Sequence, residues 1–124
     1  MKSLKGFTLL ELLVVIGIIA ILVSLGVSSY STAQKKARDA KRQSELKSFQ
    51  NAMEQCYSVN DYQYPLVTGN GTTTISETCT APTGPSMTIR DPSTKTYNVS
   101  SSTTAYSISV ILEDGNTFTI SQLQ

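Results

Sequence analysis

The sequence contains no histidine and no tryptophan, and only two of its 124 residues are cysteine. A catalytic triad or dyad that uses histidine as its base is therefore excluded, and so is a zinc site built from His and Cys ligands. No convergent pair of carboxylates stands out either. We expect no enzymatic activity, no metal site and no cofactor, which favours a structural or binding role.

The charge is nearly balanced at +1, and the length suffices for one small domain beside a membrane segment. If residues 1–6 are removed, Lys2 and Lys5 leave with them and the net charge becomes −1. Neither value indicates an acidic partner.

The two cysteines, Cys56 and Cys79, lie 23 positions apart and outside any C-x-x-C pair. This arrangement is typical of one structural disulfide in an exported domain, which requires an oxidising compartment. Two unrelated buried thiols in a cytosolic protein remain the alternative, because a free cysteine packs as a small hydrophobe.

The longest apolar run covers residues 7–27, where only Thr8, Glu11 and Ser24 are polar. These 21 residues would form about 31 Å of helix, which matches the hydrocarbon core of a bilayer. A secretory signal peptide has a shorter apolar region followed by a small-residue cleavage site, so it fits less well. We predict a transmembrane helix over residues 7–30.

Basic residues on both sides of this span give conflicting evidence about its orientation. Two precede it, and five follow it: Lys35, Lys36, Arg38, Lys41 and Arg42. The positive-inside rule alone would place the C-terminal domain in the cytoplasm. Long C-terminal domains cross largely regardless of charge, and the cysteine and Ser/Thr content fits the outside, so we expect an exported domain.

The helix is predicted to continue over residues 31–57, which contain neither Pro nor Gly and are rich in helix formers. An apolar stripe follows helical spacing: Leu46, Phe49, Met53 and Cys56 or Tyr57. A helix over residues 8–57 would be about 75 Å long, so half of it must lie outside the bilayer.

Residues 58–124 are predicted to form a globular domain of loop and antiparallel sheet. Residues 62–85 are rich in Thr, Gly and Pro, which favours loop with a short hairpin at Asn70-Gly71. Strand patterns follow at residues 95–99, 105–112 and 117–123, the last two joined by Asp114-Gly115. The predicted fold class is α+β: a long N-terminal hydrophobic helix whose C-terminal half packs against a small three-stranded antiparallel sheet.

One segment stands at the start of the apolar run: Leu4-Lys5-Gly6-Phe7-Thr8-Leu9-Leu10-Glu11-Leu12. It resembles the cleavage and methylation segment of type IV prepilins and type II secretion pseudopilins, and the resemblance covers about residues 2–30. It implies a pilin-like fold and a prepilin peptidase that cuts between Gly6 and Phe7 and methylates the amine of Phe7. Residues 1–6 would be a leader that is removed, with Lys2 and Lys5 holding the cleavage site at the cytoplasmic face.

Glu11 is a carboxylate inside an apolar span, which costs about 2.5 to 3.5 kcal/mol unless it finds a partner. The resemblance implies that the partner is the charged amine of Phe7 on a neighbouring subunit. Phe7 and Glu11 would then form the assembly site and set the axial register of a fibre. Position alone leaves an alternative, because an anion one turn from the helix start is stabilised by the helix dipole and can reach interfacial water.

The resemblance implies a structural subunit of a type IV pilus-like fibre, located first in the cytoplasmic membrane as a single-pass protein and then in a surface or extracellular fibre. Its implied partners are further pilin subunits, the prepilin peptidase, a membrane assembly platform and the lipid bilayer. Two alternatives stay open. One is a pseudopilin of a type II secretion or DNA-uptake machine, and the other is a non-polymerising single-span protein whose domain binds a ligand.

The basic run at residues 35–42 is a candidate nucleic-acid or lipid-headgroup patch. Asp39 and Glu45 lie three or four residues from its cations, which favours a solvated helix face with internal ion pairs. A nucleic-acid partner is therefore not favoured, since stacking aromatics and a second basic cluster are missing from the sequence. Asp91, Glu113 and Asp114 are predicted to serve turns and a hairpin tip and not a calcium site.

Overall fold

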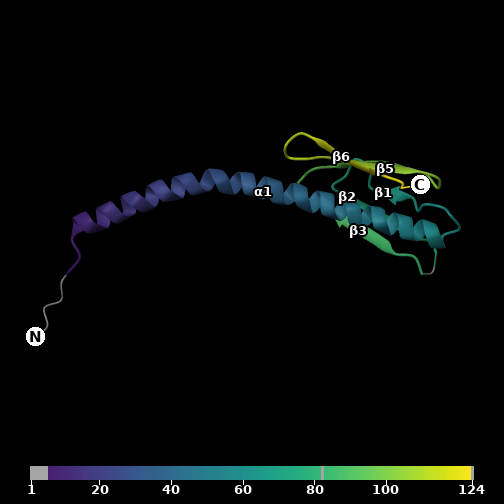
Figure 1. Cartoon of the computed structure of the whole chain (residues 1–124), viewed down its shortest axis with the longest axis horizontal. Coiled ribbons are helices and arrows are strands. Elements are labelled where there is room, and N and C mark those ends of the chain that lie inside the picture. Colours follow the sequence, from purple (N-terminus) through teal and green to yellow (C-terminus); the bar gives the residue numbers. More distant parts are fainter. Residues whose placement is uncertain (1–5, 82, 124) are drawn as a thin grey trace, which may run out of the picture. The chain divides into compact units, whose positions relative to one another are not determined.

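The computed structural model describes residues 6–81 and 83–123, which contain one long helix and six strands (Figure 1). Helix α1 spans Leu9–Val59, so the predicted unbroken helix is confirmed. The chain divides into two compact units, one up to Lys35 and one from Lys36, and each is described by itself. Lys2 and Lys5 of the predicted leader lie outside the described residues.

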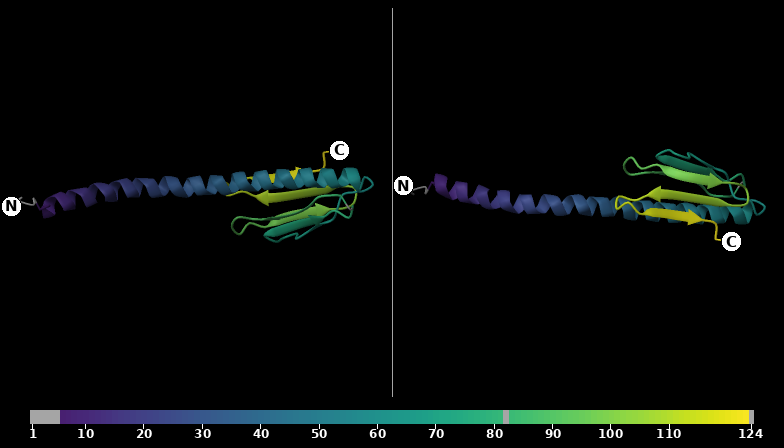
Figure 2. Two further views of the ribbon diagram at one scale, coloured as in Figure 1. Left: turned by 90° about the horizontal axis from the view of Figure 1, so that it is seen from below. Right: turned by 90° about the horizontal axis from the view of Figure 1, so that it is seen from above.

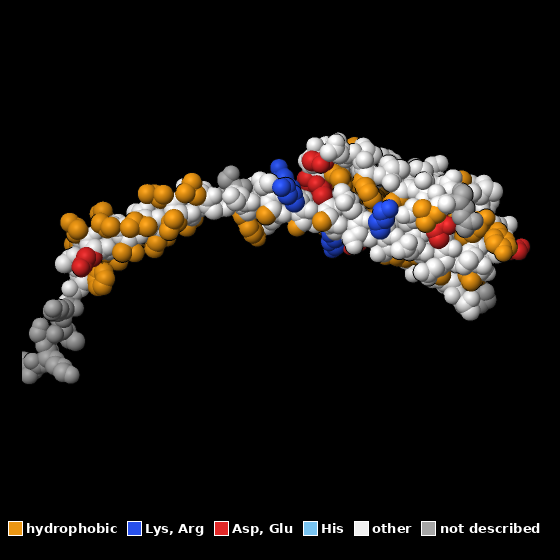
Figure 3. Space-filling view, in the orientation of Figure 1, with side chains coloured by type: hydrophobic (Ala, Val, Ile, Leu, Met, Phe, Trp, Pro, Cys, Tyr) orange, Lys and Arg blue, Asp and Glu red, His pale blue; other side chains and the backbone are white. Residues whose placement is uncertain are grey.

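The N-terminal unit leaves its apolar side chains uncovered. Every Leu, Val, Ile and Phe side chain from Phe7 to Val27 is exposed by 46 to 87%. Figure 3 shows these hydrophobic side chains along the N-terminal part of α1. The most apolar 18-residue window of this helix has a mean hydropathy of 2.8 and none of it is buried, so α1 is long and apolar enough to cross a membrane. The described residues leave this apolar surface exposed, so we expect lipid or another molecule to bury it.

The C-terminal unit contains two three-stranded antiparallel sheets. The first has the order β1-β2-β3, formed by β1 (Val67–Thr68), β2 (Thr74–Thr78) and β3 (Ser86–Arg90). The second has the order β4-β5-β6, formed by β4 (Tyr97–Ser101), β5 (Tyr106–Ile111) and β6 (Thr117–Ser121). The second sheet is the predicted meander, and the α+β fold class is confirmed.

The first sheet is an addition to the sequence-based prediction, because it occupies a stretch that was predicted to be mostly loop. Strand β2 buries two side chains on one face, and one of them is Glu77 beside the apolar Ile75. A charged residue at an inward position removes the apolar alternation by which a strand is recognised. The short hairpin predicted at Asn70-Gly71 is present as the connection between β1 and β2.

The sheets pack on the C-terminal part of α1, as Figure 2 shows. Leu46, Phe49 and Met53 of the predicted stripe are fully buried. They form one apolar cluster with residues of both sheets, which include Ile75, Ile89, Ile108, Val110 and Ile120. Burial of each such side chain contributes about 1.5 to 3 kcal/mol, so this cluster is the main source of stability of the unit.

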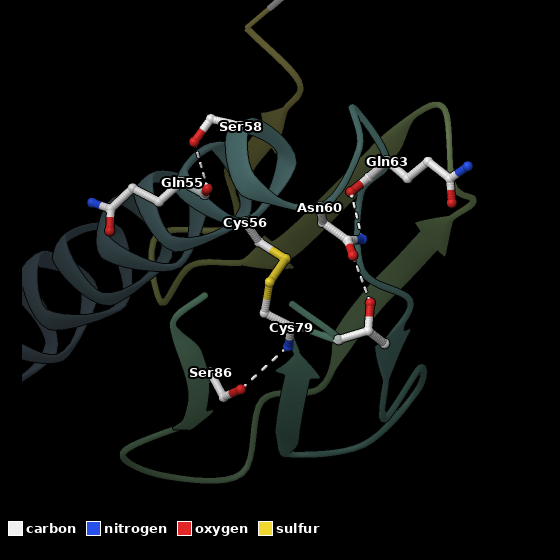
Figure 4. The surroundings of a disulfide bond; sticks show 8 residues. Gln55, Cys56, Ser58, Asn60, Gln63, Cys79 and Ser86 are labelled. Atoms are coloured by element: carbon white, nitrogen blue, oxygen red, sulfur yellow. Dashed lines mark hydrogen bonds between the residues drawn. A yellow bond between two sulfur atoms is a disulfide. The ribbon is translucent and has the colours of Figure 1, made fainter. Parts of the chain in front are cut away.

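A disulfide bond joins Cys56 near the end of α1 to Cys79 after β2, with the two Cα atoms 5.7 Å apart (Figure 4). This is the bridge that the sequence predicts. Beside it, the Thr80 hydroxyl donates a 2.6 Å hydrogen bond to the side chain of Asn60. A Cβ atom at Gly84 would overlap the Cys79 sulfur, so only glycine fits there. Closing a loop of this length stabilises the fold by about 3 kcal/mol through the unfolded chain.

Candidate functional site

Gly6 and Phe7 precede the first turn of α1 and are exposed. A Cβ atom at Gly6 would have no described atom within 4 Å. The folded chain therefore imposes no steric requirement for glycine at this position. If the glycine has a role, that role lies in contact with a molecule outside the chain.

Thr8 and Glu11 form a reciprocal capping box at the start of α1. The Thr8 amide and the Thr8 hydroxyl each donate a 2.9 Å hydrogen bond to Oε2 of Glu11. The Glu11 amide donates in return to the Thr8 hydroxyl oxygen at 3.2 Å. Thr8 is thus the N-cap residue and Glu11 the third helical residue of a T-x-x-E capping box. The sequence analysis missed this role of Thr8, although the spacing is a known signal of a helix start.

The capping box gives the Glu11 carboxylate hydrogen bonds within the chain but does not remove its charge. Its carboxylate has hydrogen-bond donors within its own chain, so it is not left without a polar partner. Both donors are neutral, however, and the Glu11 side chain is exposed. Glu11 therefore remains an accessible anion at the start of an uncovered apolar helix, where a cation from another molecule can reach it.

Two ion pairs predicted within the basic run of α1 are present, Arg42 with Asp39 and Lys41 with Glu45. Arg42 nevertheless departs from the predicted solvated face, because its side chain is fully buried. Its guanidinium donates to both carboxylate oxygens of Asp91, from Nε at 2.5 Å and from Nη2 at 3.1 Å. Nη1 donates to Asp39 at 2.7 Å and to Glu113 at 3.3 Å, and Arg38 pairs with Glu113 at 3.0 Å. The partners Asp91 and Glu113 lie far along the sequence, so local spacing could not reveal them.

The ionisation of this cluster follows from its contacts. Burial by itself would raise the pKa of Asp91, but hydrogen bonds from Arg42, Ser93 and Lys95 lower it below its ordinary value. The hydrogen bond from Arg38 lowers the pKa of the Glu113 carboxyl, and the Asp91 hydrogen bond raises the pKa of Arg42. Both signs of charge are thus retained at neutral pH, and the cluster ties α1 to the β3–β4 and β5–β6 connections.

The structure places the calcium candidates in other roles. Asp91 and Glu113 bind arginine, and Asp114 accepts hydrogen bonds from the backbone and side chain of Asn116 at the β5–β6 hairpin. Among the described residues, no group of three or more His, Cys, Asp or Glu side chains could hold a metal ion. We assign no metal site.

Glu54 on α1 accepts a second set of long-range hydrogen bonds, which the sequence analysis did not predict. The hydroxyls of Tyr64 and Tyr106 each donate to its carboxylate at 3.0 Å, and the Leu123 amide donates at 3.1 Å. One carboxylate on α1 therefore holds the loop after the helix, strand β5 and the end of the chain. Glutamate is a common residue in helices, so its presence in α1 does not by itself predict hydrogen bonds to residues far along the sequence.

Glu77 is buried, and neither of its carboxylate oxygens has a hydrogen-bond partner among the described residues. Burial raises the pKa of its carboxyl above the ordinary value, and the backbone amide of Met87 on the neighbouring strand β3 opposes this rise only in part, from outside hydrogen-bonding geometry. Because the folded-state pKa exceeds the unfolded one of about 4.3, ionisation of Glu77 opposes folding above that pH. Glu77→Gln should therefore increase the free energy of unfolding at pH 7, and the gain should vanish below about pH 4.

This prediction is checked by urea unfolding at several pH values, followed by the tyrosine near-ultraviolet circular dichroism. The matched control is Asp61→Asn, which removes an exposed carboxylate and should change stability by less than about 0.5 kcal/mol. A Glu77→Gln variant that is less stable than the parent at pH 7 would show that the carboxylate has a stabilising partner.

Residues 1–27 match the family model described as the prokaryotic N-terminal methylation motif. The chain carries this methylation motif. Gly6, Phe7, Thr8 and Glu11 all lie within it, and the capping box forms the start of the helix that makes up most of the described part of the motif. The resemblance to type IV pilins and type II secretion pseudopilins is thereby supported.

Three curated proteins illustrate what the chain is similar to. It is 37% identical over 78 residues to the type II secretion system core protein G of Escherichia coli, which covers 63% of this chain and 52% of the relative. It is 41% identical over 56 residues to the prepilin peptidase-dependent protein D of the same organism, covering 45% of this chain and 38% of the relative. It is 51% identical over 39 residues to the type IV wide pilus major component PilA4 of Thermus thermophilus, covering 32% and 30%.

The chain spans between about a third and a half of the length of these relatives. No solved structure matches it significantly.

Proposed function

We propose that the chain is a structural subunit of a type IV pilus-like or pseudopilus fibre and that it acts without enzymatic activity. Residues 7–30 insert into the cytoplasmic membrane in a single pass, and residues 58–124 lie outside, where the disulfide can form. A prepilin peptidase removes residues 1–6 and methylates Phe7. An assembly platform then transfers the subunit into a helical polymer at the cell surface.

The observation that carries this proposal is the methylation motif at the start of a helix whose apolar side chains up to Val27 are all exposed. Lipid can cover this surface before assembly, and the same helices of neighbouring subunits can cover it afterwards. A non-polymerising single-span protein would use only the first of these covers. Such a protein would also not require the methylation motif.

A pseudopilin role in secretion is supported by one further observation. The match to the secretion core protein G extends over 78 residues. This is too long to lie within residues 1–59, so it includes part of the sheet domain, whereas the match to PilA4 extends over only 39 residues. The two fibre types differ in length and partners more than in the chemistry of the subunit. Immunogold microscopy of surface material sheared from cells separates them, because long labelled fibres indicate a pilus and short labelled fibres indicate a pseudopilus.

Processing is tested by Gly6→Leu. A leucine side chain before the scissile bond should block cleavage and leave the full-length chain in the membrane. Mass spectrometry of the parent should show an N-terminus at Phe7 that carries one methyl group, whereas the variant should retain Met1 or Lys2.

The control is Gly17→Ala, at a second glycine of α1 whose added Cβ would also have nothing within 4 Å. It should be cleaved and methylated like the parent. A parent chain with an intact Met1 and no methyl group would contradict the processing proposal, and the absence of labelled fibres of either length would contradict the assembly proposal.

A further inference from the structure

An open cleft of about 280 Å³ lies beside the end of α1. Three segments that are distant in sequence line it, represented by Gln63 and Leu66 after the helix, Thr78 at the end of β2, and Thr103 before β5. The volume is near the lower end of the ~300 to 1,000 Å³ that is typical of small-molecule sites. It suits a ligand the size of one or two sugar rings.

Three of the six polar side chains that line this cleft are free to bind a ligand, whereas those of Asn60, Tyr64 and Thr80 already form hydrogen bonds within the chain. No described hydrogen bond engages the side chains of Gln63, Thr78 or Thr103, and all three residues are exposed. An amide and two hydroxyls can each donate and accept hydrogen bonds. Figure 4 shows the Gln63 side chain extending away from the Cys56–Cys79 bridge.

Among the described residues that line the cleft there is no Asp, Glu, Lys or Arg, so this lining carries no charge. An ionised ligand would have to give up water without finding an opposite charge in return. Apolar surface is present next to the polar groups, since the exposed Leu66 lines the same cleft, whereas Pro65 is largely buried. The lining therefore combines neutral hydrogen-bonding groups with an apolar patch.

The segment that carries Gln63 is held in a fixed and unusual conformation. Asp61 and Tyr62 have positive φ angles of 54° and 58°, which non-glycine residues rarely adopt. The Asn60 side chain donates to the Gln63 carbonyl at 3.0 Å, and the Tyr64 amide donates to the Thr103 carbonyl at 2.9 Å. The first bond fixes the backbone within the segment after the helix, and the second joins this segment to the one that carries Thr103, so the backbone of the cleft is held before any ligand binds.

We propose that this cleft binds a neutral saccharide. A sugar ring presents several hydroxyls that donate and accept, which matches the free amide and hydroxyls, and its C–H face fits the exposed Leu66 side chain. This binding activity is separate from the proposed fibre function, because it uses neither the methylation motif nor the exposed part of α1.

The test applies the full-length chain in detergent to an array of neutral, sialylated and uronic-acid oligosaccharides, followed by titration with the best neutral compound. We expect neutral saccharides to be retained and acidic ones not. Gln63→Ala and Thr103→Val should each weaken binding about fivefold, as expected for the loss of one hydrogen bond. The matched control is Thr119→Val, at an exposed threonine of β6 outside the cleft lining.

Folding is not a confounding factor for these variants, because the replaced side chains form no described hydrogen bond. Circular dichroism and the melting temperature check this directly, and NMR shift changes on titration should concentrate on residues 60–66, 78–80 and 103. The proposal is overturned if no neutral saccharide binds, if only acidic oligosaccharides or peptides bind, or if Gln63→Ala and Thr103→Val bind like the parent.

Discussion

Glu11→Ala is expected to leave cleavage before Phe7 intact and to abolish fibre assembly. In the proposed fibre, the carboxylate of one subunit pairs with the amine of Phe7 on the next, inside a bundle of apolar helices. Removing the anion leaves the cation of the neighbour unpaired in an environment of low dielectric constant, where such a loss costs about 3 to 5 kcal/mol per contact. Because the contact repeats at every subunit, the predicted result is processed protein in the membrane and no sheared fibres on immunogold microscopy.

The capping box makes a sharper variant available, namely Glu11→Gln. Glutamine at the third helical position can still bond to the N-cap residue, so Glu11→Gln retains the helix start and removes only the charge. If charge pairing drives assembly, Glu11→Gln should fail as completely as Glu11→Ala. Normal fibres from Glu11→Gln would show that Glu11 acts as a helix cap, which is the alternative that its position leaves open.

Arg42→Met is expected to destabilise the C-terminal unit by about 3 to 5 kcal/mol, because it removes one partner of a buried ion pair. Three carboxylates bind this guanidinium, from Asp39, Asp91 and Glu113. Without it, Asp91 is left buried as an uncompensated anion. The measurement is urea unfolding followed by tyrosine near-ultraviolet circular dichroism, which reports on the sheet unit because most of the tyrosines lie there.

Two controls separate the buried pair from the loss of positive charge alone. Lys36→Met removes an exposed cation from the same helix and should change stability by less than about 0.5 kcal/mol. Adding Asp91→Leu to Arg42→Met should recover part of the loss, since an apolar pair can replace a buried ion pair. Equal stability of the parent and Arg42→Met would contradict the structural role of this cluster.

Regular patterns of apolar residues were sufficient to predict the parts of the fold that they determine. The stripe of Leu46, Phe49 and Met53 predicted the buried face of α1, and the strand patterns after residue 95 predicted the second sheet. The first sheet was not predicted, because Glu77 occupies an inward position of β2. The ion pairs of Arg42 and the hydrogen bonds of Glu54 were not predicted for a related reason. The sequence does not distinguish a charged residue that faces solvent from one that binds a residue far along the chain.

The sequence by itself determined the features that depend on neighbouring residues. These are the methylation motif, the long apolar helix with its T-x-x-E start, the helix stripe and the hairpin glycines. Hydrophobic periodicity, capping and turn chemistry all act over a few residues, so they can be read locally.

Only the tertiary structure decided which distant groups meet. It placed Arg42 among carboxylates that lie up to 71 residues away, brought two tyrosines to Glu54, and assembled a cleft from residues 60, 63–66, 78, 80 and 103. The physical reason is that a buried charge or hydrogen-bonding group is stabilised by its spatial neighbours, and these are set by the packing of both sheets on α1. For Glu11, the structure identified a hydrogen-bond partner within the chain, and the proposed fibre supplies the opposite charge.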